Sequence, residues 1–355
     1  MSNYCKYYKQ IKQISSDYGQ HWSDTSEYRQ GDLYEYGSSD CSSPTPPIPV
    51  LYERHYLTFV AETTSSIIFS GGTGLSGSTD GGVTWFDMGT SAVTLSAGER
   101  LMVKRVREQN TSGLYGFGNS TGTYHVEGNP LSLVFGDDFK NGAGVKTDLT
   151  NYQYALGYMF NGCSGLTNID NLVLPATTLA DSCYASMFRG CTSLTTVPSN
   201  MLPATTLADN CYESMFSGCT SLTTVPVLSA TTLAEWCYFR MFSNCTNLTT
   251  APALLVTTLK NYCYREMLTK CTSLTTAPEL QATALVEGCY WGMFRGCTNL
   301  NYIKCLATDI DAYDCTYQWV YGVSNSGTFT KAANMSSWPR GSAGIPNNWT
   351  VIDAT

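Results

Sequence analysis

Basic residues are scarce in this chain of 355 residues, which has 20 Lys and Arg against 28 Asp and Glu. The formal net charge of −8 leaves no basic stripe of the kind that binds a phosphate backbone, so we expect no nucleic-acid partner. Long apolar runs are also missing, and none approaches the length that crosses a bilayer, so we expect no membrane insertion. With 43% hydrophobic and 14% charged residues, the chain can still bury a sizeable core.

Residues that carry common catalytic or metal chemistry are few. The chain has only His21, His55 and His125, and its regularly placed cysteines recur at intervals of eight rather than two to four. This spacing does not fit a zinc site, so we expect no metal and no cofactor. Neither a nucleophile elbow with partners nor a phosphate loop is present, so we expect no enzyme. A carboxylate pair for glycoside hydrolysis stays open, because it needs only two acids at the right distance.

One pattern returns along the middle of the chain. Cys183-Tyr-x-x-Met-Phe-x-x-Cys191-Thr-Ser-Leu-Thr-Thr is repeated from Cys211, Cys237, Cys263 and Cys289, at a step of 28 residues once and 26 thereafter. Degenerate copies precede and follow these five, as capping repeats do. A fixed period in the twenties predicts a solenoid in which each copy buries its apolar face against its neighbours.

Within one copy, Leu179, Cys183 and Met187 are four residues apart, which predicts one face of a short helix. Gly190, or its equivalents Gly218, Asn244 and Gly296, would end that helix, although Lys270 breaks this pattern. The following Leu-Thr-Thr run, closed by proline, predicts a short strand. We therefore predict an α+β solenoid whose coils contain one strand and one helix.

The cysteines and methionines of the copies are predicted to form a structural core of free, buried thiols and thioethers, because two cysteines that flank a helix turn are too far apart for a disulfide. The predicted core residues are Cys183, Met187, Cys191, Cys211, Met215, Cys219, Cys237, Met241, Cys245, Cys263, Met267, Cys271, Cys289, Met293 and Cys297.

The sequence Met-Phe-x-Gly-Cys-Thr-Ser-Leu-Thr-Thr-x-Pro resembles the BspA-like leucine-rich repeats of bacterial cell-surface proteins, over roughly residues 129–300. The closing segment, from Cys297 to Val351, resembles the ends of such proteins in gut Bacteroides and in their phages. The resemblance implies leucine-rich-repeat coils and a role in adhesion or recognition rather than catalysis. Fibres of this kind are often trimers, so by analogy a homo-oligomer is expected.

The rest of the chain divides by composition. We predict a β-rich N-terminal anchor at 1–43, a proline-rich linker at 44–50, a small β-sandwich-like domain at 51–128, the leucine-rich-repeat solenoid at 129–304 and a C-terminal capping segment at 305–355. Strands are expected near 56–60, 66–70, 83–86, 92–95 and 100–106, and a strand-like N-terminal cap at 126–139. A Cys5–Cys41 pair stays open.

The motif Ser78-Thr-Asp80-Gly-Gly-Val-Thr84-Trp85 resembles the Asp-box of sialidase propellers and many other β proteins. One interpretation is a glycosidase. We favour a hairpin whose aspartate caps its own turn, because residues 51–128 have room for one or two propeller blades at most.

Outward positions vary between copies whereas inward positions barely change. Equivalent positions should lie above one another, so a column of aromatic and arginine side chains is expected, exposed and without partners inside the chain. This candidate receptor-binding site comprises Trp236, Phe239, Arg240, Tyr262, Arg265, Trp291 and Arg295. Aromatic rings interleaved with arginine suit stacking on sugars or packing into a protein partner, although they could equally be surface variation or a subunit contact.

The first ten residues contain no apolar segment of a secretory signal, which favours a protein assembled in the cytoplasm over an exported one. We therefore expect a non-enzymatic phage fibre or receptor-binding protein, located in the virion. It would contact other virion proteins through residues 1–43 and recognise a host cell-surface glycan or protein. The alternatives are a BspA-like adhesin on the bacterial surface and a capsule-degrading tailspike enzyme.

Overall fold

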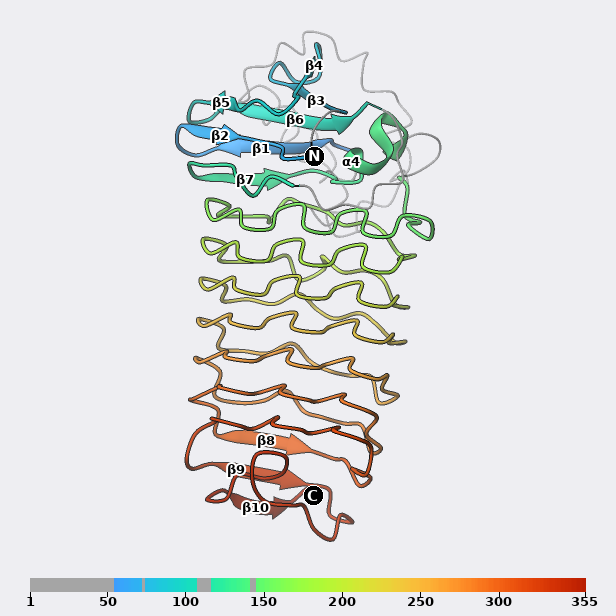
Figure 1. Ribbon diagram of the computed structural model, residues 1–355, viewed down its shortest axis with the longest axis vertical. Helices are drawn as coiled ribbons and strands as arrows, with labels where there is room; N and C mark the ends of the chain where they lie inside the picture. The colour runs from blue at the N-terminus through green and yellow to red at the C-terminus, as the bar shows by residue number, and fades with distance from the viewer. Residues whose placement is uncertain (1–53, 72–73, 107–115, 141–144) are drawn as a thin grey trace, which may run out of the picture. The chain divides into compact units, whose positions relative to one another are not determined.

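The computed structural model describes residues 54–71, 74–106, 116–140 and 145–355. The expected anchor at 1–43, the linker at 44–50 and the Cys5–Cys41 pair lie outside these residues. Leu51–Thr355 form one compact unit, which contains every element described below (Figure 1). Among the described residues, no helix has the length and apolarity of a bilayer-spanning segment.

The unit begins with a five-stranded antiparallel sheet in the order β4-β3-β6-β1-β7. Its strands are β1 (Leu57–Ala61), β3 (Leu75–Ser78), β4 (Phe86–Asp87), β6 (Arg100–Arg105) and β7 (Tyr124–Glu127). A separate pair is formed by β2 (Ser65–Ile67) and β5 (Val93–Leu95). Strand β6 alternates buried and half-buried residues, as a strand with one covered face should.

The strands expected near 56–60, 66–70, 92–95 and 100–106 correspond to β1, β2, β5 and β6. The strand expected at 83–86 is wrong except for Phe86, because the preceding residues form a turn. The strand-like cap expected at 126–139 is also wrong beyond β7, since it continues as helix α4 (Ser132–Phe135) and the 3-10 helix η1 (Gly136–Lys140). These two short helices lie beside the sheet, where the Ser132 hydroxyl donates to the carbonyl oxygen of Val103 at 2.9 Å.

The predicted α+β solenoid of leucine-rich-repeat coils is wrong. Helices α4 and η1 are the only helices among the described residues, and both precede the repeated segment. The copies contain no helix, and their Leu-Thr-Thr segments form no regular strand before β8, only isolated bridges such as that between Thr276 and Tyr302. The hydrogen bonds of the backbone amides determine which structure the copies form instead.

Each copy contains a continuous series of tight turns, which we call its turn run. The turn runs comprise residues 153–162, 181–190, 209–218, 235–244, 261–270, 287–296 and 313–322. In the second of them, the amide of Met187 donates to the carbonyl of Tyr184 three residues earlier at 3.2 Å. The next amide, that of Phe188, donates to Met215 of the following copy at 2.9 Å. Amides therefore bond alternately within a copy and between copies.

Left-handed residues recur every four positions in each turn run. Ser182, Ser186 and Gly190 have φ values of 56°, 55° and 73°. An α-helix needs right-handed φ and ψ throughout, so these residues exclude it. The four-residue spacing of apolar side chains, which suggested a helix, is produced equally well by a series of four-residue turns. Small or polar residues at every fourth position were the signal that distinguishes the two.

Successive copies lie one on another, as Figure 1 shows, and their cores form ladders of identical side chains. Phe188 and Phe216 stack with ring centroids 5.5 Å apart and planes 4° from parallel. Tyr238 and Tyr264 do the same at 5.8 Å and 2°. Each cysteine and methionine predicted for the core is buried. Identical side chains can stack in this way because the backbone repeats its conformation from copy to copy.

The cysteines have a specific role in these ladders. In the described part of the chain all thirteen are free and buried. The Cys245 thiol donates to the carbonyl oxygen of Phe216 in the preceding copy at 3.1 Å, and Cys219 and Cys271 make the equivalent bonds. The thiol is thus a small apolar group that also supplies a donor to a buried carbonyl.

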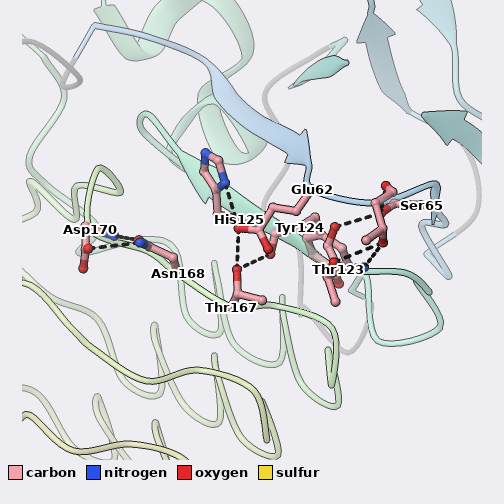
Figure 2. Close-up of polar contacts among 9 residues, drawn as sticks. Glu62, Ser65, Thr123, Tyr124, His125, Thr167, Asn168 and Asp170 are labelled. Atoms are coloured by element: carbon pink, nitrogen blue, oxygen red, sulfur yellow. Dashed lines mark hydrogen bonds and ion pairs between the residues drawn. The ribbon is translucent and has the colours of Figure 1, made fainter. Parts of the chain in front are cut away.

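Two structures adjoin the ends of the stacked copies. At the first copy, the amides of Tyr124 and Val126 of β7 donate to the carbonyls of Gly165 and Asn168. Around this junction Glu62 accepts hydrogen bonds from Thr167 at 2.8 Å and contacts His125 (Figure 2). The sheet and the copies consequently share one continuous hydrophobic core.

At the other end, the three-stranded parallel sheet comprises β8 (Tyr302–Cys305), β9 (Thr328–Lys331) and β10 (Thr350–Asp353). Trp319, Trp338 and Trp349 are buried beside it, and Trp319 stacks on both Tyr290 and Trp338. These indoles cover apolar surface at the end of the tyrosine ladder.

Buried thiols make the fold sensitive to alkali. Burial raises the pKa of Cys237 from 9.0 to about 12. Because the folded chain holds this proton more tightly than the unfolded chain, the stabilisation is complete below pH 9 and is lost as the pH rises towards 12. In that window one such thiol lowers the free energy of unfolding by about 1.4 kcal/mol per pH unit.

Cys237→Ala should therefore flatten the dependence of unfolding free energy on pH by about that slope, despite lowering stability at pH 7. Urea denaturation at several values between pH 7 and 10.5 measures both effects. Equal slopes for the variant and the wild type would show that the thiol does not ionise on unfolding.

Candidate functional site

Side chains at equivalent positions of the turn runs form columns along one face, which we call the turn face. Trp236 and Phe239 lie on one copy, Tyr262 and Arg265 on the next and Trp291 on the third. All five are partly exposed, whereas the ladder residues between them are buried. The structure thus brings the predicted aromatic residues together on consecutive copies.

The rings contact one another closely. Trp236 stacks on Tyr262 with centroids 4.2 Å apart and planes 18° from parallel. Phe239 meets Trp236 edge-on at 5.2 Å, and Trp291 meets Tyr317 of the next copy edge-on at 5.0 Å. Offset stacks and edge-to-face pairs are the arrangements that aromatic quadrupoles favour.

Arg265 lies at the centre of this aromatic cluster. Its guanidinium carbon is 3.9 Å from the centroid of the Trp291 ring and 5.2 Å from that of Trp236. Phe239 and Tyr262 are each 5.7 Å away. The buried Nε atom makes no hydrogen bond and lies 3.7 Å from a Glu266 oxygen, and the cation–π contacts with the rings add to the stabilisation of the guanidinium.

The expectation that these side chains would lack partners inside the chain is therefore wrong. Successive copies are only about 5 Å apart, so large residues at equivalent positions of neighbouring copies must pack together. Gly288 shows the consequence: a Cβ atom there would come within 2.3 Å of the Tyr262 ring. The Tyr262 hydroxyl donates to Glu287, and this hydrogen bond raises the pKa of Tyr262.

Beside the aromatic cluster the turn face contains a pocket of about 270 Å³. Arg240 joins the two, because its guanidinium lies 4.7 Å from the Phe239 centroid and also lines the pocket. Glu266 pairs with Arg240 at 2.7 Å and with Arg265 at 3.7 Å. The full lining is Arg189, Ser217, Arg240, Ser243, Asn244, Glu266, Thr269, Lys270 and Arg295.

Arg189, Glu266 and Lys270 are pocket residues that the sequence interpretation missed, whereas Arg240 and Arg295 were named. Lys270 was noticed only as a break in the column of Gly190, Gly218 and Gly296, and Glu266 was not compared with Ser214 and Gly292, the small residues of its own column. The signal that could have revealed them is a departure from Gly, Ser or Asn at a position where the other copies keep it.

This departure has an energetic cost. Trp236, Arg240, Tyr262, Glu266 and Lys270 all have left-handed φ, between 52° and 59°. Left-handed φ costs an ordinary residue roughly 1–2 kcal/mol relative to its usual conformations. Tyr154, Tyr158, Asp314 and Gln318 share this conformation on the first and last copies. Among the five copies between them, large residues with left-handed φ lie only in the turn runs 235–244 and 261–270. Strain of this kind tends to accumulate at functional sites, which singles out this part of the turn face.

The Asp-box motif forms a hairpin turn between β3 and β4. Asp80 accepts hydrogen bonds from the amide of Thr84 at 2.9 Å and from the Ser78 hydroxyl at 2.8 Å. These bonds, chiefly those from Thr84, lower the pKa of Asp80 to about 2. These hydrogen bonds of the aspartate are all local, and Trp85 packs edge-on against Tyr56.

In the ranges that the structure describes, no three His, Cys, Asp or Glu side chains cluster as ligands for a metal ion. The chain matches no protein-family model, and comparison with curated proteins and with solved structures gave no match either. The geometry of the turn face is therefore the basis for any inference about function.

Lys270→Gly should stabilise the protein by about 1 kcal/mol, because glycine adopts φ of 59° without strain. The matched control is Gly218→Ala at the equivalent position, where a Cβ has room but φ is 76°, and which should destabilise by a similar amount. Urea denaturation measures both. A loss of stability in Lys270→Gly would mean that the lysine is kept for packing instead.

Proposed function

We propose that this protein is a non-enzymatic recognition protein that binds a glycan on a cell surface through the aromatic cluster and pocket of the turn face. One observation carries the proposal. Large aromatic and charged side chains occupy strained left-handed positions on two adjacent copies, although neighbouring copies fold with glycine, serine or asparagine there. A large side chain that lowers the stability of the fold, at a position where a small residue folds equally well, is best explained by a role in binding a ligand.

The chemistry of the cluster suits a sugar. Trp236, Tyr262 and Trp291 offer apolar ring surface, and rings of this type bind the C–H faces of pyranoses as they bind other apolar groups. Arg265 is held by four rings, so little rotamer entropy is lost when a ligand contacts it. The ladders below keep the whole surface rigid, which lowers the cost of binding further.

We propose that the protein is part of a phage virion, where it would serve as a fibre or receptor-binding protein. The support is the resemblance of the closing segment to proteins of gut Bacteroides and their phages. A surface adhesin of the bacterium is the second candidate, since the same resemblance extends to it. Mass spectrometry of purified virions separates the two: finding the protein only in outer-membrane fractions would exclude the virion.

Trp236→Ala combined with Trp291→Ala should reduce attachment to host cells at least tenfold. Stacking anchors at interfaces contribute about 1–3 kcal/mol each, and tenfold corresponds to 1.4 kcal/mol. A moderate fall in melting temperature should accompany the loss, because both indoles contact Arg265. Flow cytometry with labelled protein measures attachment.

Val227→Ala provides the matched control, since this side chain is 59% exposed and lies outside the turn runs. Its attachment should equal that of the wild type. If the double variant stays folded and still binds host cells fully, the turn face is not the recognition surface.

A further inference from the structure

We infer that the pocket of the turn face is a subsite for acidic glycans, in which carboxylate or sulfate groups on successive sugars are bound by arginine and lysine. This inference rests on the proposed function and narrows its ligand class. It depends on the arrangement of charge along the stacked copies, which the aromatic cluster does not require.

The floor of the pocket comes from one column of equivalent positions: Arg189, Ser217, Ser243, Thr269 and Arg295. The three central members are short hydroxyl residues and are buried, so the surface is hollow above them. The two arginines at the ends are exposed. With copies roughly 4.8 Å apart, four steps place these arginines about 20 Å apart along the column. An elongated, hydroxyl-lined hollow with a cation at each end fits a segment of a polymer better than a single small anion.

The lining also includes Arg240 and Lys270, which come from two other columns. The lining therefore contains Arg189, Arg240, Lys270 and Arg295 against one carboxylate, that of Glu266, in a chain whose net charge is −8. A local excess of positive charge on an acidic protein is not a by-product of composition. It raises the local concentration of anionic ligands and accelerates their association.

Three of these four cations have no carboxylate partner in the described ranges, and the Arg295 guanidinium lies 5.8 Å from the Tyr321 ring centroid. Glu266 is paired with Arg240, but none of the ion pairs found in the described ranges includes Arg189, Lys270 or Arg295. Glu213 is the other nearby acid: burial raises its pKa, and the charges of Arg240 and Arg189 oppose that shift. Unpaired, exposed guanidinium groups bind carboxylates and sulfates through bidentate, charge-assisted hydrogen bonds.

Strain supports the assignment from an independent direction. Arg240 and Lys270 occupy left-handed positions, with φ of 53° and 59°. The equivalent residues one copy earlier are Ser214 and Asn244, which tolerate this conformation better. Because Arg240 also lies over Phe239, one ligand could contact the pocket and the aromatic cluster together. A sugar polymer with acidic groups combines both kinds of contact.

The test uses the full chain and three polymers: polygalacturonate with carboxylates, dextran sulfate with sulfates, and neutral dextran. Biolayer interferometry should show binding to one or both acidic polymers, weakened by salt, and none to neutral dextran. Arg189→Gln combined with Arg295→Gln should reduce that affinity at least tenfold. Lys260→Gln combined with Lys304→Gln removes the same charge outside the pocket and should leave affinity within about twofold.

Glu266→Gln gives a change of opposite sign. It removes the only carboxylate of the lining and frees Arg240, so affinity for the acidic polymer should rise a few-fold. A residue needed only for structure would not strengthen binding when replaced. No binding of either acidic polymer, or equal losses in the pocket and control variants, would overturn the inference.

Polyglutamate tests whether the subsite selects glycans. If it competes with the acidic polysaccharides at equal charge concentration, the pocket recognises charge alone and the assignment to glycans fails. The proposed function is tested separately by attachment of the same variants to host cells. Attachment that needs Trp236 and Trp291 but not the pocket arginines leaves recognition intact and rejects the acidic subsite. Binding of the acidic polymers without any attachment to cells would support the acidic subsite and reject the proposed role in cell-surface recognition.

Discussion

The repeated part of this protein depends on one constraint, the alternation of backbone hydrogen bonds in the turn runs. One amide closes a tight turn within its copy, and the next donates to the following copy, as Met187 and Phe188 do. Buried backbone groups must be paired, so a single copy would leave half of these amides unsatisfied. The copies consequently stabilise one another, and the sheet at one end and the tryptophans at the other cover the apolar surface that remains.

The same constraint separates a uniform interior from a variable face. The ladders require equivalent residues to match, because each ring stacks on its counterpart in the next copy and thiols such as that of Cys245 bond the same phenylalanine carbonyl position of the preceding copy. Residues of the turn face contact the core less, so they can vary. Only the left-handed positions restrict them, by favouring Gly, Asn and small polar residues. A binding surface built there has to accept strain, and Trp236 and Lys270 accept it on a rigid support.

Large parts of this arrangement were predictable. The period, the degenerate end copies and the inward cysteines follow from the spacing of identical residues. The aromatic members of the candidate site were found by comparing copies, because equivalent positions in a repeat must lie in columns. The prediction of a helix in each copy was wrong, because apolar residues four positions apart fit both a helix and a series of four-residue turns. Spacing alone carries no information about the sign of φ, although Gly190 and Gly218 are residues that favour a positive φ.

By itself, therefore, the sequence determined that residues recur with a period of 26 to 28 and which of them point inward. Tertiary structure decided the rest. Whether an amide bonds within its copy or to the next depends on how closely the copies approach, which is a property of the stack. The aromatic cluster around Arg265 and the pocket between Arg189 and Arg295 likewise join residues from separate copies. Such sites exist only once the copies are stacked, because no single copy contains enough of their residues.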